Sequence, residues 1–135
     1  MDEATKRAYL RARLDKARDD LSNARSDLEH GYLRGAANRA YYAVFHMASA
    51  SLLWLDVERA RHSGVQSAFG ERLVKSGIIE PEFSTLYAEA RKIREEQDYD
   101  LDADPLDAVE ASQIVDDAER FVNRIEQYLR QVGAI

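Results

Sequence analysis

The sequence predicts an all-α protein, an up-and-down bundle of about five helices, on three observations. Apolar residues recur at helical spacing through most of the chain, and no segment shows the alternation typical of a strand. Only 2 prolines and 6 glycines interrupt the 135 residues. Helical segments joined by short links are typical of a bundle. The length suits one hydrophobic core, so we expect residues 1–135 to form a single domain.

Residues 4–30 and 32–57 form the first two predicted helices. One face of the first helix repeats apolar residues at alternating spacings of four and three, which is typical of an amphipathic helix. These residues are Leu10, Leu14, Ala17, Leu21, Ala24 and Leu28. Gly31 would end this helix in the manner of a C-cap. The second helix is apolar on most of its surface, so we expect it to be central or to contact another subunit as well.

Three further helices are predicted over residues 64–76, 81–97 and 105–132. Ser63 precedes the first of them as a candidate N-cap, and Pro81 occupies the first position of the next, where proline is tolerated. The last of the three is amphipathic along its length. An acidic loop with four aspartates at alternating positions precedes it, but the loop lacks the glycine and the closing glutamate of a calcium-binding loop. We therefore expect no metal site there.

Composition limits the classes of partner. The net charge is −6, from 25 acidic and 19 basic residues, so the overall field opposes nonspecific binding to nucleic acid. An RNA partner would have to contact a local basic cleft. The absence of cysteine excludes disulfides and cysteine-based metal sites. No apolar run approaches the roughly 20 residues that span a bilayer, and no apolar signal segment begins the chain. We expect a cytoplasmic protein without a membrane partner.

The second predicted helix carries two residues that are unusual on an apolar helix. Within the stretch Asn-Arg-Ala-Tyr-Tyr-Ala-Val-Phe-His at 38–46, Arg39 and His46 lie two turns apart and therefore on one face. Buried arginines are usually paired with a carboxylate, and a histidine in such a helix can be a hydrogen-bonded core residue. The alternative is that both residues face a functional site.

Four segments, in their order and spacing, resemble the HEPN domain family. They are the stretch at 38–46, His-Ser-Gly-Val at 62–65, Ala-Arg-Lys-Ile-Arg-Glu-Glu-Gln-Asp-Tyr-Asp at 90–100, and Ala-Glu-Arg-Phe-Val at 118–122. The resemblance covers about residues 20–130. It is closest to short, single-domain prokaryotic HEPN proteins, which are often encoded beside a minimal nucleotidyltransferase and treated as toxin–antitoxin pairs.

The resemblance implies a homodimer and, in many members, a metal-independent ribonuclease. In those members an arginine and a histidine, separated by four to six residues, line a cleft at the dimer interface. Arg39 and His46 are the candidates here: a guanidinium can hold the phosphate, and an imidazole can move a proton to or from the RNA 2′-hydroxyl. Ala40 departs from the family pattern, which usually places a polar residue directly after the arginine.

A second alignment places Arg94 at the family's arginine and Asp98 where the histidine would stand. A carboxylate there repels phosphate, so this register implies weakened or lost ribonuclease chemistry. The same two residues are i and i+4 on one predicted helix, where they can form an ordinary ion pair. Asp98 is also a candidate partner for Arg39.

Three more residues complete the candidate substrate-binding or polar network. Tyr42 could supply a hydroxyl, although packing is the more common role of an aromatic residue in a buried helix. His62, in a basic link, is expected to be solvated or to take part in capping. Tyr99 is the nearest counterpart of a tyrosine that a partner nucleotidyltransferase modifies with AMP in some family members, and the interpretation favoured here is an aromatic plug over the end of the bundle.

Two functional hypotheses remain from the sequence, beside a third in which the domain only oligomerises through its apolar second helix. The first is the HEPN component of a toxin–antitoxin-like pair that cleaves RNA with neither metal nor cofactor. The alternative is a non-catalytic module that pairs with a nucleotidyltransferase or binds nucleotide. The surroundings of Arg39 and His46 distinguish the two, because an enzyme needs both in a solvent-reachable cleft, whereas a module would enclose them against carboxylates.

Overall fold

The computed structural model describes residues 1–135 and contains helices and no strands, which confirms the predicted all-α class. The elements are α1 (Glu3–Glu29), α2 (Leu33–Trp54), α3 (His62–Phe69), the π-helical turn η1 (Gly70–Val74), α4 (Pro81–Tyr99) and α5 (Ala108–Gln131). The third predicted helix is thus an α-helix continued by a π-helical turn. No helix is both long enough and apolar enough to cross a lipid bilayer.

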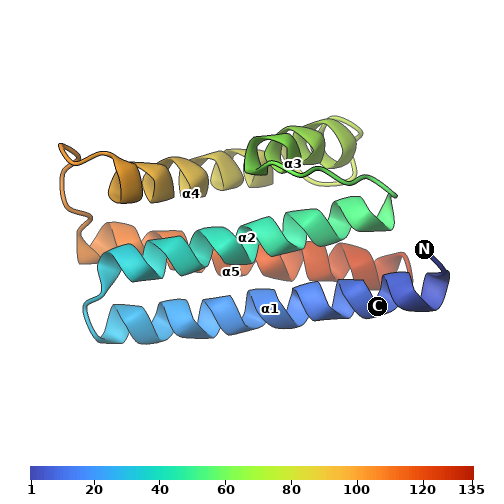
Figure 1. Cartoon of the computed structure of the whole chain (residues 1–135), viewed down its shortest axis with the longest axis horizontal. Helices are drawn as coiled ribbons and strands as arrows, with labels where there is room; N and C mark the ends of the chain where they lie inside the picture. Colours follow the sequence, from blue (N-terminus) through green and yellow to red (C-terminus); the bar gives the residue numbers. More distant parts are fainter.

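The long helices run alternately up and down (Figure 1). Helix α2 lies between α1 on one side and α4 on the other, and α5 packs behind it. The short α3 lies at the end of α4, above the C-terminal half of α2. The predicted central position of the second helix is confirmed by this arrangement, because α2 contacts α1, α3, α4 and α5.

Small residues allow α2 to pack closely against its neighbours. Six of its alanines are buried, and their short side chains permit neighbouring helices to approach. These are Ala36, Ala37, Ala40, Ala43, Ala48 and Ala50. One core cluster of 33 buried residues draws on every helix. The core therefore holds α2 rigidly and fixes the direction in which its polar side chains point.

Some helices begin or end at residues other than the predicted ones, because a local interaction determines where the helix starts or stops. Asp107 caps α5 by accepting a hydrogen bond from the Glu110 amide at 2.8 Å, so this helix begins three residues later than predicted. Helix α2 ends at Trp54 rather than at residue 57. The predicted Ser63 cap is wrong, because α3 already begins at His62. Gly31, with φ +76°, follows α1 as predicted.

Candidate functional site

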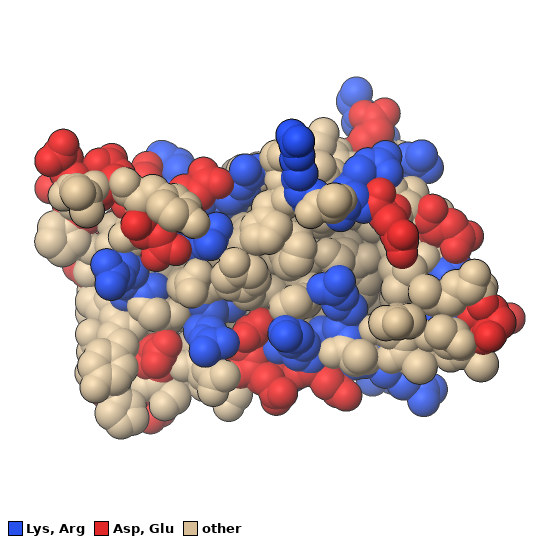
Figure 2. Space-filling view, in the orientation of Figure 1, with Lys and Arg blue, Asp and Glu red and all other residues tan.

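The face of α2 between α1 and α4 carries two polar clusters, one on each side. Figure 2 shows this face, where Lys and Arg side chains border an uncharged hollow over α2. Acidic side chains gather at the end of the molecule where α4 joins α5. The basic surface is therefore local, on a molecule whose net charge is −6.

The first cluster joins α1 to α2 around Asp20. The Arg39 Nη1 donates to the Asp20 Oδ1 at 3.4 Å, and the Asp20 Oδ2 lies 3.7 Å from the His46 Nε2. The other ring nitrogen of His46, Nδ1, is 2.7 Å from the Arg13 Nη1. Asp20 and His46 are buried, whereas the Arg39 side chain is 50% exposed. The predicted partner of Arg39, Asp98, is wrong, because Asp20 takes this role.

The Arg13 contact determines which ring nitrogen of His46 carries the proton. A guanidinium can only donate, so Nδ1 accepts and the ring proton sits on Nε2, toward Asp20. Burial lowers the pKa of His46 to about 4, and the charges of Arg13 and Lys16 add to this effect. Burial also raises the pKa of Asp20, although the Arg39 hydrogen bond opposes the shift. His46 is therefore neutral at pH 7, and its contact with Asp20 is not an ion pair.

The second cluster joins α2 to α4 around Arg94. The Arg94 Nε donates to the Asn38 Oδ1 at 3.3 Å, and its Nη2 donates to the Tyr42 hydroxyl at 3.2 Å. Its guanidinium also lies 5.3 Å from the centroids of the Tyr41 and Tyr42 rings. The ion pair between Arg94 and Asp98, at 3.4 Å, has the predicted i,i+4 spacing. Tyr42 thus joins a polar network as well as packing.

His62 lies at the start of α3, beside this cluster. Its Nδ1 is 3.0 Å from the Tyr41 hydroxyl, and its ring centroid is 4.4 Å from that of Phe45. Its Nε2 has no hydrogen-bond partner, and the side chain is partly exposed. Burial lowers the pKa of His62, and the positive charges of Arg94 and Arg91 add to this effect. The expectation that His62 is merely solvated or part of a cap is wrong, because a buried tyrosine holds it.

Tyr99 lies at the C-terminal end of α4. It is 71% exposed, so the interpretation as an aromatic plug is wrong. The Arg94 guanidinium lies 5.7 Å from the centroid of its ring.

No group of three or more histidine or acidic side chains could hold a metal ion.

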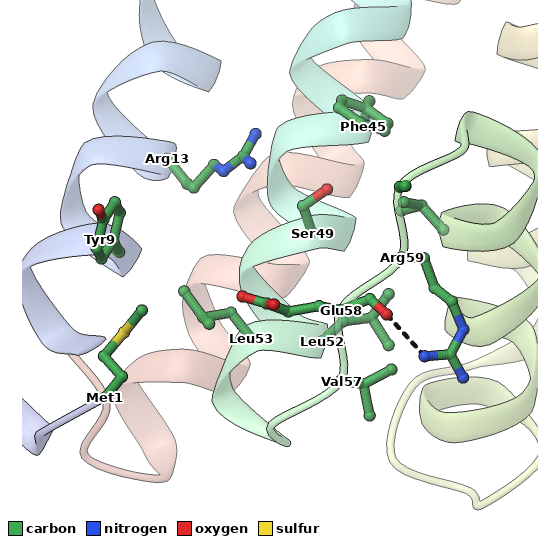
Figure 3. A pocket seen from close by; sticks show the side chains of 12 residues that line it. Met1, Tyr9, Arg13, Phe45, Ser49, Leu52, Leu53, Val57, Glu58 and Arg59 are labelled. Carbon is green, nitrogen blue, oxygen red and sulfur yellow. Dashed lines mark hydrogen bonds between the residues drawn. The ribbon is translucent and has the colours of Figure 1, made fainter. Parts of the chain in front are cut away.

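A cleft of about 570 Å³ adjoins the first cluster through Arg13 and reaches the ring of Phe45 (Figure 3). It lies between α1, the C-terminal half of α2 and the segment that leads to α3. Arg13 and Phe45 line it, and these two residues contact His46 and His62. In Figure 3 the Arg59 guanidinium points away from α2 and donates to the Glu58 carbonyl. Arg13 is therefore the cation that the cleft shares with the first cluster.

Sequence reasoning missed Asp20 and Arg13. One signal for Asp20 was present, because it directly precedes Leu21 and follows Ala17 by three residues, so it lies at the edge of the apolar stripe of α1. A carboxylate at such a position needs a partner on the helix packed against it. No comparable signal marks Arg13 among the other basic residues of α1.

Comparison with known proteins gives consistent matches along the chain. A protein named "Putative toxin MJ0605" from Methanocaldococcus jannaschii is 35% identical over 126 residues, which cover 93% of this chain and 92% of that protein. "UPF0332 protein glr0978" from Gloeobacter violaceus is 29% identical and covers 87% and 94% respectively. "Putative toxin MJ0142", also from M. jannaschii, is 26% identical and covers 86% and 78%. The family model described as the HEPN domain matches residues 10–128, and the chain belongs to this family.

Proposed function

We propose that this HEPN protein is a toxin-like protein that binds RNA at the basic face of α2 and cleaves it without a metal ion. One observation carries the proposal: arginines from α1, α2 and α4 and two histidines surround one face of α2 beside a cleft of about 570 Å³. The toxin names of two relatives support a toxin-like role. An RNA target would place the activity in the cytoplasm.

Arg39 is the proposed phosphate-binding group. Asp20 engages its Nη1, while half of the side chain remains exposed, so the rest of the guanidinium can donate to a phosphate. Arg94 is less available, because its side chain is 14% exposed and bound to Asn38, Tyr42 and Asp98. We assign Arg94 to the ordering of the α4 side of the site.

His46 is the proposed proton-transfer group of the α1 side. It is neutral, as a base must be, but its acceptor nitrogen faces Arg13. A phosphate that binds Arg13 would compete for this guanidinium and free Nδ1. The proposal therefore makes Arg13 a second phosphate-binding residue. It also includes a homodimer, which the family resemblance implies and in which a second copy would complete the cleft.

The test is cleavage of a mixed RNA substrate by the purified full chain in EDTA. We expect cleavage by the parent and loss of cleavage in the Arg39→Ala and His46→Ala variants. Arg130→Ala is the matched control, because Arg130 is an exposed arginine of α5 that pairs only with Glu126. An inactive parent would contradict the ribonuclease, and activity in both variants would place the site elsewhere.

Tyr99 favours the alternative function, a module that pairs with a minimal nucleotidyltransferase. Its exposed ring leaves the hydroxyl accessible for transfer of AMP. Incubation with ATP and a nucleotidyltransferase encoded beside this protein would then add one AMP, which mass spectrometry detects. The Tyr99→Phe variant should remain unmodified, and Tyr32→Phe, which removes another exposed tyrosine, serves as the control. Modification of Tyr99→Phe would contradict this role.

A further inference from the structure

We propose that His62 is a second proton-transfer group of this site and that Tyr41 is the positioning residue that orients it. The inference rests on the proposed ribonuclease function and deepens it. Neither residue belongs to the arginine–histidine pair, Arg39 and His46, that the family resemblance implies. His46 and His62 differ in what surrounds their ring nitrogens.

Tyr41 holds one nitrogen of His62 and leaves the other free. Tyr41 is fully buried, and its hydroxyl lies 3.0 Å from the His62 Nδ1. Burial raises the pKa of Tyr41 to about 12, so the phenol stays neutral at every pH at which RNA is stable. Either group can donate in this contact, and in the tautomer in which the His62 Nδ1–H donates to the phenol oxygen, Nε2 carries the lone pair. The nitrogen with no partner in the protein is then the one that can accept a proton.

His46 and His62 both lie beside the aromatic rings of Phe45 and Tyr42. The Phe45 ring centroid is 4.4 Å from that of His62 and 5.6 Å from that of His46. The Tyr42 ring lies 5.8 Å and 6.4 Å from the same two rings. Because Phe45 also lines the cleft, a phosphodiester bound there would contact the ring beside which both imidazoles lie.

His62 offers a ring nitrogen with no partner in the protein, whereas His46 offers one only when a phosphate draws Arg13 away from its Nδ1. Both nitrogens of His46 face charged groups, whereas the His62 Nε2 faces no partner. Arg94, which contacts the same Tyr41 and Tyr42 rings as His62, places a positive charge nearby. Such a charge can stabilise the phosphorane that forms in the transition state.

The proposed step balances without any cofactor. The His62 Nε2 accepts the proton of the ribose 2′-hydroxyl while the 2′-oxygen forms a bond to phosphorus. The bond from phosphorus to the 5′-oxygen breaks, and this oxygen takes a proton from water. The products are a 2′,3′-cyclic phosphate and a 5′-hydroxyl end, and the protonated His62 then releases its proton to solvent.

The test compares cleavage with binding in the full chain. We expect His62→Ala to reduce the RNA cleavage rate by about 100-fold or more. The same variant should bind a 2′-deoxy oligonucleotide of the same sequence, which lacks the nucleophile, as tightly as the parent does. His62→Gln, which keeps a polar side chain of similar size, should lose cleavage as well. His30→Ala is the matched control, since His30 is exposed at the end of α1 and bonds only to the Ser26 carbonyl.

A pH profile separates the positioning role of Tyr41 from a merely structural one. The groups that face His62 are Tyr41, Tyr42 and Phe45 of α2, and Arg91, Arg94 and Glu95 of α4. Parent cleavage should rise with pH as His62 loses its proton, and this rise should be absent from any residual cleavage by His62→Gln. Tyr41→Phe should lower kcat, leave KM unchanged and shift the midpoint of the rise.

The outcomes distinguish the ribonuclease function, the role of His62 and the role of Tyr41. Parental cleavage in His62→Ala or His62→Gln would overturn the role of His62 and leave the ribonuclease function intact. An inactive parent would overturn the ribonuclease function, and the role of His62 with it. A Tyr41→Phe variant with the parent's kcat and pH profile would overturn the positioning role. Circular dichroism melting curves show whether each variant is folded.

Discussion

The two sides of α2 place a histidine beside arginines in opposite ways. On the α1 side, His46 is buried between Arg13 and Asp20, so both ring nitrogens face charged groups. On the α4 side, His62 is held through one nitrogen only, by a neutral tyrosine. Proximity to arginine therefore does not by itself make a histidine reactive. What matters is whether a nitrogen remains for the substrate.

The largest expected effect that separates the two sides is the pH dependence of stability. The folded pKa of His46, about 4, lies below its unfolded value of 6.5, so the unfolded state binds more protons between these values. The free energy of unfolding should therefore fall as pH drops from 6.5 toward 4, by up to about 3 kcal/mol from this group. The raised pKa of Asp20 opposes part of the loss, because the folded state holds that proton more tightly.

Urea denaturation at pH 7 and pH 5 of the parent, His46→Gln and His62→Gln measures this effect. His46→Gln should flatten the pH dependence, while His62→Gln should change it less, since its imidazole is partly exposed. An equal response of the two variants would show that the histidines share the same environment. The comparison between the two sides of α2 would then fail.

Arg94→Ala should have the next largest effect. The substitution leaves the Tyr42 hydroxyl, the Asn38 amide oxygen and the Asp98 carboxylate without this donor. Because these partly buried hydrogen bonds involve a charged group, their removal should lower the free energy of unfolding by about 2 kcal/mol. Arg130→Ala, at an exposed pair, should cost less than about 0.5 kcal/mol. Similar losses in the two variants in urea denaturation would contradict an ordering role for Arg94.

The sequence was sufficient for the fold because the fold depends on periodicity. Apolar stripes predict the five helices and a second helix that is central or contacts another subunit, and the contacts of α2 with α1, α3, α4 and α5 confirm the central place. Helix ends were less predictable, because single interactions decide them. Val57 donates its amide to the Leu52 carbonyl, and Asp56 has a positive φ of 60°, which closes α2 earlier than its apolar pattern suggests.

Within the polar clusters, only contacts between residues close in the sequence could be predicted. Arg94 and Asp98 follow from i,i+4 geometry on one helix. The pairing of Asp20 with Arg39, or of Arg13 with His46, depends on how α1 is shifted and rotated against α2. Tertiary packing sets this register, and a single sequence does not state it. The link between Tyr41 and His62 escaped prediction for the same reason.

Tyr99→Ala gives the smallest expected effect and sharpens the comparison on the α4 side. The Arg94 guanidinium lies over three tyrosine rings, but only that of Tyr99 is mostly solvent-exposed. A cation–π contact at an exposed site contributes about 0.5 kcal/mol, so Tyr99→Ala should lower the free energy of unfolding by roughly this amount. Urea denaturation beside Arg94→Ala measures it. A loss as large as that of Arg94→Ala would mean that Tyr99, rather than Tyr42 and Asn38, holds the guanidinium in place.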